Sequence, residues 1–196
     1  MIEKAPKAEA VAAEAEKGYD LLVAGLDKTV SNKTDFHDDI TNLAAGFDGP
    51  LAVVEARDGQ LDDPLRSRLS IMVPVNGTDP SRRAAEVAIV IARATKAPLT
   101  ALYVAPRNQK GRRSRQYEEA ILKDIVALAE TYGIEIKTAV RTDVAADQAI
   151  LKEMGRRRNN LLVLGVGRRP GEKLFFGDTA AALLATSTKS LLFVAT

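Results

Sequence analysis

From residue 68 onward, short apolar runs alternate with longer stretches in which apolar residues recur every three or four positions. The apolar runs predict buried strands at Leu69–Val75, Leu99–Val104, Leu161–Gly165 and Leu191–Ala195. A stretch of alternating polar and apolar residues predicts one more, half-buried strand, whose core-facing residues are Ile134, Ile136, Thr138 and Val140.

Four helices are expected between these strands. Asp79 is placed to cap the first, with Pro80 in its first turn. The second ends at Gly133, and Asp143 caps the third. The fourth spans about Asp178–Thr186. The resulting order, βαβαβαβαβ, predicts an α/β fold: an open, doubly wound, five-stranded parallel sheet with helices on both faces.

An internal repeat extends this pattern toward the N-terminus. Residues 17–56 match residues 157–196 without a gap, at an offset of 140. Matching positions include Leu21, Leu22, Val23, Gly25 and Leu51, which recur as Leu161, Leu162, Val163, Gly165 and Leu191. The repeat predicts a duplicated unit whose first copy holds only helix, strand, helix, strand. We therefore expect the chain to be a fragment, with a partial copy over 1–56, a linker over 57–67 and a complete unit over 68–196.

The composition of the chain excludes several classes of partner and functional site. The chain of 196 residues is 46% hydrophobic and 28% charged, which is ordinary for a folded soluble protein, and its net charge of +2 gives no reason to expect nucleic acid as a partner. It has no cysteine and one histidine, His37, so thiolate or histidine-rich metal sites and a Ser-His-Asp triad in the complete unit are not expected. No apolar run approaches the roughly 20 residues of a membrane span, so we expect a cytoplasmic protein.

Two loops could meet beyond the carboxyl ends of the strands, where sheets of this type bind ligands. One follows the first strand and comprises Pro74, Val75, Asn76, Gly77 and Thr78; the other runs from Gly165 through Gly167, Arg168 and Arg169 to Lys173. Glycines let backbone N–H groups approach phosphate oxygens, and the helix starting near Gly177, Asp178 and Thr179 offers a positive dipole end. The same pattern also suits purely structural turns, so both interpretations stay open.

The complete unit resembles a universal stress protein domain over residues 68–196. The segment IMVPVNGTDPSRRAAEVAIVIARATKAPLTALYV is similar to the opening of that domain, and Gly167 and Gly177 enclose the nine residues of its glycine signature. The resemblance implies an adenine nucleotide such as ATP, with Mg²⁺, held by Pro74, Val75, Asn76, Gly77, Val104, Gly165, Gly167, Arg168, Gly177, Asp178 and Thr179.

Three positions depart from the family pattern. Asn76 stands where the family has the aspartate that faces the adenine, Gly165 falls one place late, and Asp178 follows Gly177 directly. A carboxylate near a triphosphate weakens binding unless Mg²⁺ or Arg168 offsets it. In the partial copy, Asp27 and His37 replace Gly167 and Gly177, so no nucleotide is expected there.

The tandem arrangement and the segments RRPGEKLFFG and EEAILKDIVALAETYGI resemble the cytosolic C-terminal tail of bacterial monovalent cation:proton antiporters. This resemblance implies a regulatory role at the inner face of the membrane, with the antiporter membrane domain as partner. The alternatives are a stand-alone or dimerisation module without nucleotide and a slow ATPase; for the latter, Asp143 and Asp178 are better interpreted as helix caps than as bases.

Three surface features complete the predictions. The basic stretch Arg107–Arg115 is either a solvated loop or a contact for anionic lipid headgroups. Arg156, Arg157 and Arg158 are expected to complement the dipole of the third helix. The strands Leu51–Glu55 and Leu191–Ala195 are candidate sheet edges, which could pair within the chain or across a homodimer.

Overall fold

The computed structural model describes residues 21–25, 49–57, 68–106, 111–142, 145–167 and 176–195, with seven isolated residues before or between them (10, 13, 17, 18, 41, 47 and 59). Its strands are β1 (Leu22–Gly25), β2 (Leu51–Glu55), β3 (Ile71–Val75), β4 (Leu99–Val104), β5 (Lys137–Arg141), β6 (Leu161–Val166) and β7 (Ser190–Ala195). Its helices are α4 (Asp79–Thr95), α5 (Arg112–Thr131), α6 (Ala146–Arg157) and α7 (Asp178–Thr186).

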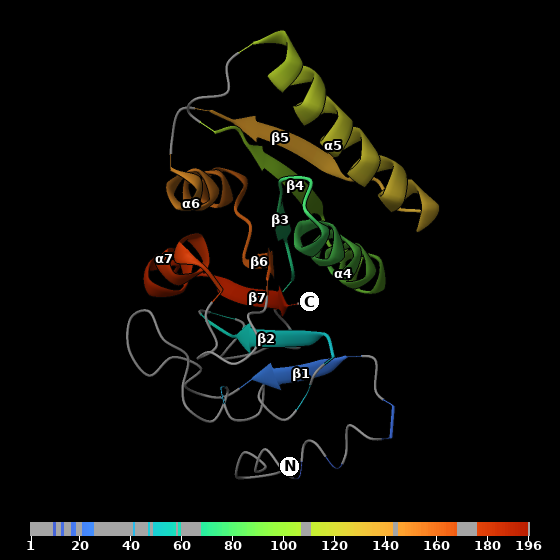
Figure 1. The fold of residues 1–196 in the computed structure, drawn as a ribbon, viewed down its shortest axis with the longest axis vertical. Helices are drawn as coiled ribbons and strands as arrows, with labels where there is room; N and C mark the ends of the chain where they lie inside the picture. The colour runs from blue at the N-terminus through green and yellow to red at the C-terminus, as the bar shows by residue number, and fades with distance from the viewer. Residues whose placement is uncertain are drawn as a thin grey trace.

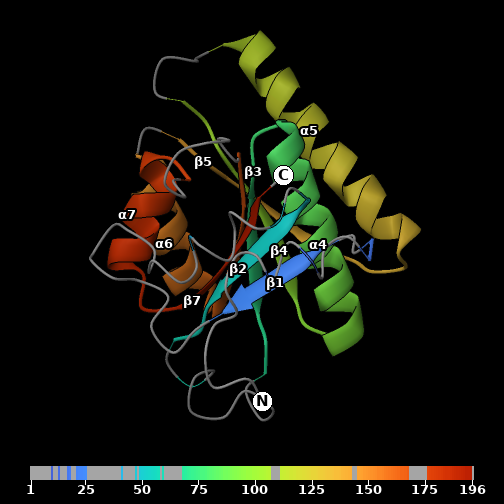
Figure 2. The ribbon, with the colours of Figure 1, turned by 60° about the horizontal axis from the view of Figure 1, so that its bottom comes forward.

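All seven strands of the described residues form one sheet in the order β1-β2-β7-β6-β3-β4-β5. The last five strands in this order are mutually parallel, as predicted. Helices α4 and α5 cover one face and α6 and α7 the other (Figures 1 and 2). Because strand side chains alternate between faces, the sheet has two cores. Met72, Leu162 and Phe193 belong to the α6/α7 core, and Val73, Val163 and Val194 to the α4/α5 core.

The pairing of β1 with β2 has the same direction and register as the pairing of β6 with β7. β1 pairs with β2 in parallel, and the pair Leu22 with Leu51 lies 140 positions before the pair Leu162 with Leu191 of β6 and β7. The two halves then meet through an antiparallel pairing of β2 with β7. Val53 lies opposite Phe193, its own counterpart in the repeat, so the register is symmetric about this pair. The strands expected as edges therefore pair with each other inside the chain.

Most predicted boundaries hold, but two helix caps were wrong. The N-cap of α4 is Thr78, so Asp79 is the first helical residue instead of the cap. The N-cap of α6 is Ala145; Asp143 lies outside the described residues and does not occupy that position. In both cases the side chain that looked like a cap lies one or two positions from where the backbone enters the helix.

The fifth strand and the basic stretch also differ from the prediction. Strand β5 begins only at Lys137, and its buried residue is Ala139, whereas Thr138 is exposed because β5 is the outer strand of the sheet. Arg112, Arg113 and Arg115 belong to the start of α5 and not to a loop, while residues 107–110 lie outside the described part.

Arg57, expected in a linker, is instead fixed against α7. Its guanidinium group donates to the carbonyl oxygens of Leu184, at 2.8 Å, and Ser187 at the C-terminal end of that helix. Its backbone N–H donates to Ser190 Oγ at 2.9 Å, and the Ser190 hydroxyl donates back to the Arg57 carbonyl. A cation at this helix end satisfies free carbonyls and complements the dipole. The end of β2 is thereby tied to α7.

A buried carboxylate on α6 was missed by the sequence analysis. Glu153 has only 1% of its side chain exposed and forms ion pairs with Arg141, Arg156 and Arg157. Hydrogen bonds from Arg156, and also from Arg157 and Arg141, lower the pKa of Glu153 to about 2, although burial acts in the opposite direction. Arg156 and Arg157 thus neutralise a specific buried charge, a stronger role than the dipole complement expected for them.

The Glu153 cluster predicts a pH dependence of stability. The folded-state pKa lies below the ordinary value of 4.5, so its stabilisation is complete above that value and is lost as the pH falls from about 5 toward 2. Glu153→Gln should lower the free energy of unfolding at pH 7 by about 3 kcal/mol and flatten this acid limb. Urea unfolding followed at several pH values measures both effects.

The matched control is Lys152→Gln, which changes an exposed neighbour on the same helix and should leave stability within about 0.5 kcal/mol. An acid limb that is equally steep in Glu153→Gln and in the unmodified chain would contradict this account.

Candidate functional site

The candidate site lies at the carboxyl ends of β3 and β6. These strands are neighbours, but their paired register covers only Ile71 with Leu161 and Met72 with Leu162. Beyond these pairs β3 stays paired with β4, and β6 with β7. The chain continues from β3 to α4 and from β6 toward α7, so the strand order reverses between β3 and β6. This is the position at which open α/β sheets bind ligands. The structure therefore brings Pro74–Thr78 and the described start of the second predicted loop, residues 165–167, to one edge.

The loop after β3 is held by its own side chains. Asn76 Oδ1 accepts hydrogen bonds from the Thr78 backbone N–H at 3.1 Å and from the Thr78 hydroxyl at 2.7 Å. The Ser81 hydroxyl donates to the Thr78 carbonyl at 2.9 Å. The Asn76 oxygen is thus used to shape the turn before α4. Its Nδ2 group has no partner among the described residues and is exposed, so it remains a free donor.

Helix α5 lies against this turn, which the sequence did not indicate. Gly77 has a φ of 82°, and a Cβ there would stand 2.9 Å from the Tyr117 hydroxyl and 2.8 Å from Ile121 Cδ1. Tyr117 is 53% exposed, so its aromatic ring is accessible next to the turn at Gly77. Burial, with contributions from Tyr117 and Glu118, raises the pKa of the neighbouring Tyr103, which keeps its hydroxyl neutral.

Gly165 has a packing role that requires no ligand. A Cβ at this position would lie 2.0 Å from the Pro80 carbonyl oxygen and 2.7 Å from the Ser81 nitrogen. Only a glycine permits the first turn of α4 to lie directly on β6. The nearby Val75 and Val166 are buried, and Pro74 and Val104 are half-buried. These four side chains support the site, and Val75 belongs to the α4/α5 core.

The loop residues nearer α7 remain open. A Cβ on Gly167 would meet no atom of the described residues within 4 Å, and Gly167 is exposed. Gly177 is the N-cap of α7 with a φ of 87°, and it offers no capping side chain. Asp178 and Thr179 are exposed in the first turn. Arg168 and residues 169–175 lie outside the described part, so the predicted contribution of Arg168 stays a prediction.

The first turns of α4 and α7 both lie at this edge, and neither N-cap makes a side-chain cap bond. Free N–H groups at such ends bind anions. Asp79 and Asp178 add negative charge there, so an anion with a bound cation fits better than a bare anion. No group of three or more His, Cys, Asp or Glu side chains suitable for a metal occurs among the described residues.

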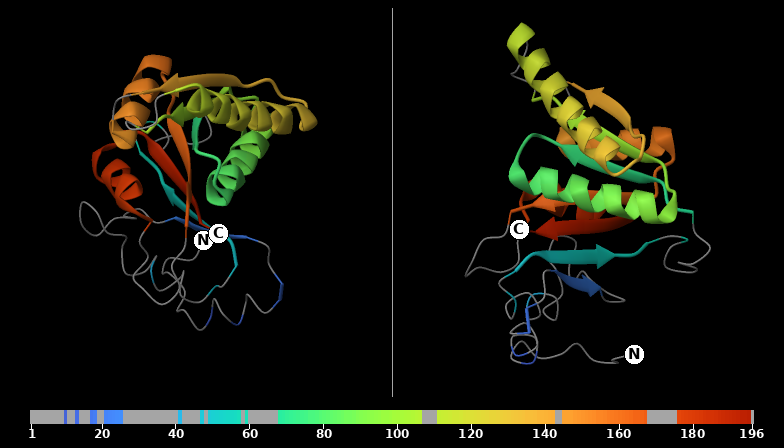
Figure 3. Two further views of the ribbon diagram at one scale, coloured as in Figure 1. Left: turned by 45° about the horizontal axis from the view of Figure 1, so that its top comes forward. Right: turned by 90° about the vertical axis from the view of Figure 1, so that its right-hand side faces the viewer.

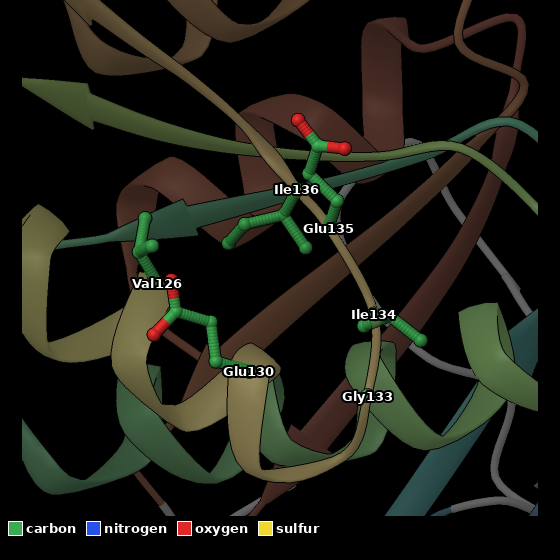
Figure 4. Close-up of a pocket in the computed structure, with 6 residues that line it drawn as sticks. All are labelled: Val126, Glu130, Gly133, Ile134, Glu135 and Ile136. Atoms are coloured by element: carbon green, nitrogen blue, oxygen red, sulfur yellow. The ribbon is translucent and has the colours of Figure 1, made fainter.

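A depression of about 440 Å³ lies away from this edge, between the C-terminal end of α5 and the segment before β5. Val126 and Glu130 of α5 and Gly133–Ile136 line it (Figure 4). Two carboxylates, Glu130 and Glu135, stand at this depression, which disfavours an anionic ligand. This depression is therefore less suited to a nucleotide than the site at the two loops.

Comparison with known proteins identifies the family. The family model described as Universal stress protein family matches residues 68–195. The chain belongs to the universal stress protein family. None of the curated protein sequences compared with it matches significantly. No helix in the described ranges is long and apolar enough to span a membrane.

Solved universal stress proteins share the fold. One from Archaeoglobus fulgidus in complex with dAMP is 17% identical, with a TM-score of 0.55, over 64% of this chain and 97% of that one. Another, in complex with cAMP, is 23% identical, with a TM-score of 0.51, over 65% and 97%. A longer universal stress protein from Archaeoglobus fulgidus DSM 4304 is 15% identical, with a TM-score of 0.60, over 92% of this chain and 62% of that one.

Substitutions at the two glycines of the site distinguish a role in packing from a role in ligand binding. Gly165→Ala should lower the free energy of unfolding by about 2 kcal/mol, because the added methyl group forces β6 and α4 apart. Urea unfolding at neutral pH measures the change. Gly167→Ala, two residues along and in open space, is the matched control and should change stability by less than about 0.5 kcal/mol. Equal effects of the two substitutions would refute the packing role.

Proposed function

We propose that the chain is a regulatory module in which residues 68–196 bind an adenine nucleotide at the edge formed by β3, β6 and the first turns of α4 and α7. The observation that carries the proposal is that, among the described residues, Gly167 has open space over it at the same edge as two helix N-termini without side-chain caps. Related structures in complex with dAMP and with cAMP support the class of ligand.

The residues divide between the two ends of such a ligand. Asn76 Nδ2 is a donor for the base or ribose, and the exposed Tyr117 ring supplies a stacking face beside it. The backbone of Gly167 and Gly177, with Thr179, suits phosphate oxygens. Asp178 favours a phosphate that carries Mg²⁺, because its carboxylate would repel an uncompensated triphosphate. We assign no preference among ATP, ADP and AMP.

Residues 1–56 are, in this proposal, a degenerate copy of the same domain, with residues 57–67 as the connection. The sequence match has an offset of 140, and the residue pairs of β1 with β2 recur 140 positions later in β6 with β7. In the pairing of β2 with β7, Val53 lies opposite Phe193, which is also 140 positions away. The longer Archaeoglobus fulgidus DSM 4304 protein, which matches 92% of this chain, is consistent with a fold extending beyond one unit.

The similarity of residues 118–134 and 168–177 to the cytosolic tail of cation:proton antiporters leads us to propose an antiporter membrane domain as the partner. A nucleotide could bias such a transporter only through different affinities for two of its states. Helix α7 offers a physical link, because its N-terminus lies at the site and its C-terminus is held by Arg57. The alternative is a dimerisation module without nucleotide, which the exposed β1 edge favours.

Contact with the membrane surface forms a separate part of the proposal. Arg112, Arg113 and Arg115 are exposed at the start of α5 and could bind anionic headgroups, each adding about 1 kcal/mol near the surface. Sedimentation with vesicles of anionic or neutral lipid tests this part. Binding only to anionic vesicles, weakening steeply with salt, is expected; equal binding to both lipids would contradict it.

Calorimetric titration of the full chain with Mg·ATP, ADP and AMP tests nucleotide binding. We expect micromolar affinity for at least one of them and at least about tenfold weaker binding in Gly167→Val, because the valine side chain fills the open space without disturbing the fold. Gly155→Val, on α6 and also in open space, is the control and should bind normally.

The absence of binding heat with all three nucleotides, in folded protein, would overturn the nucleotide assignment and favour the dimerisation module. ATP turnover that is abolished by Asp178→Asn would instead show an enzyme, since it would give that carboxylate a catalytic role.

A further inference from the structure

The outer edge of β1 carries no charged residue and pairs with no other strand of the described part of the chain. Leu21 is 43% exposed and Val23 is 60% exposed, and among the described strands β1 has only β2 beside it in the sheet. The opposite outer strand, β5, carries Lys137 and Arg141 at its two ends, whereas β1 reads Leu-Val-Ala-Gly. Natural sheets blunt free edges with charges, prolines or covering segments. The β1 sequence contains neither a charged residue nor a proline, which indicates an edge suited to pairing with another strand.

The second copy of the repeat shows what pairs with such a strand. Leu161 and Val163, the counterparts of Leu21 and Val23, are only 9% and 0% exposed. In that copy, β3 pairs with β6 in parallel, with Ile71 opposite Leu161. Helix α4 covers the face that bears Val163. None of the four helices α4–α7 lies beside β1 (Figure 3).

The two faces of β1 differ in exposure. Ala24 is 4% exposed and belongs to the α6/α7 core, with Leu22 packed against it. Val23 points to the other face, which corresponds to the α4/α5 side of the second copy. The uncovered surface therefore matches a strand of the β3 type together with a helix of the α4 type.

Gly25 supplies an independent observation. Its counterpart Gly165 must be glycine because the first turn of α4 lies on it, with the Pro80 oxygen 2.0 Å from the site of a Cβ. At Gly25 the nearest atoms to a Cβ belong to Val54, at 3.5 and 3.6 Å, which is ordinary contact, and the residue has no positive φ. Nothing in the described structure requires a glycine there. The first turn of a docking helix would.

We propose that β1 is the docking edge for the amino-terminal half of a universal stress fold: a strand pairing in parallel opposite Leu21 and Leu22, followed by a helix whose first turn lies on Gly25. The occupant is a polypeptide segment similar to residues 68–140, separate from the copy of that segment already used in this chain. The inference rests on the proposed duplication and is independent of nucleotide binding at the second unit.

A fusion tests the fit. Residues 68–140 placed directly before Met1 keep the full chain and continue the repeat in phase, since residue 1 corresponds to residue 141. The chain has no cysteine, so Val23→Cys is a single reporter for a thiol reagent. It should react freely in the chain alone and at least about 100-fold more slowly in the fusion. Val90→Cys at the original position, on α4 and 50% exposed, is the control and should react equally in both.

The substitution Gly25→Ala tests whether the first turn of the added helix lies on Gly25. In the fusion it should restore the reactivity of Val23→Cys, because the added methyl group blocks the helix. In the chain alone it should leave the urea midpoint unchanged, unlike Gly165→Ala. This second measurement does not depend on whether the fusion folds, and an equally large loss for both glycines would overturn the proposal.

Other outcomes also decide the matter. Full reactivity of Val23→Cys in a fusion whose added segment is folded would overturn the fit. Protection in the chain alone that disappears on dilution would show that a second copy of this chain covers β1, which would also overturn it. Loss of nucleotide binding alters none of these labelling rates, so failure of the proposed function is distinguishable from failure of this inference.

Discussion

The antiparallel pairing of β2 with β7 is the contact on which the rest of the structure depends. It joins two parallel sections into one sheet and places the backbone groups of both strands in a continuous ladder. Leu51, Val53 and Phe193 are 0% exposed because this junction lies in the middle of the molecule. Without the pairing, β7 would present a long apolar edge to solvent, a state that folded proteins avoid.

The junction also determines how the candidate site is connected. Arg57, two residues after the end of β2, binds carbonyl groups at the C-terminal end of α7. The first turn of the same helix lies at the sheet edge of the candidate site. Across that edge, Gly165 allows α4 to lie on β6 so closely that two helix N-termini approach the same loops. A glycine that resembled part of a phosphate loop thus acts mainly through backbone packing, and the open position is Gly167.

The sequence predicted the five parallel strands of residues 68–196, the bounds of α7 and the position of the residues that directly follow β3 and β6 at one edge of the sheet. These succeeded because buried parallel strands are continuous apolar runs, and because strand order fixes where carboxyl ends meet. It failed where the decision lies outside the local segment. Asp79 and Asp143 are acceptable caps by residue type, yet the backbone enters each helix at another residue. No local pattern marked Glu153, because its burial depends on three arginines that form ion pairs with it in the folded chain.

The sequence alone determined the alternation of elements, the offset of 140 and the family, since periodicity and spacing are properties of the chain itself. Only the tertiary structure decided that β2 and β7 pair symmetrically about Val53 and Phe193, that α5 lies against Gly77, and that Val23 is exposed while Val163 is buried. The physical reason is that burial and close approach depend on which distant segments cover a residue, and equal residues in two copies of a repeat meet different neighbours.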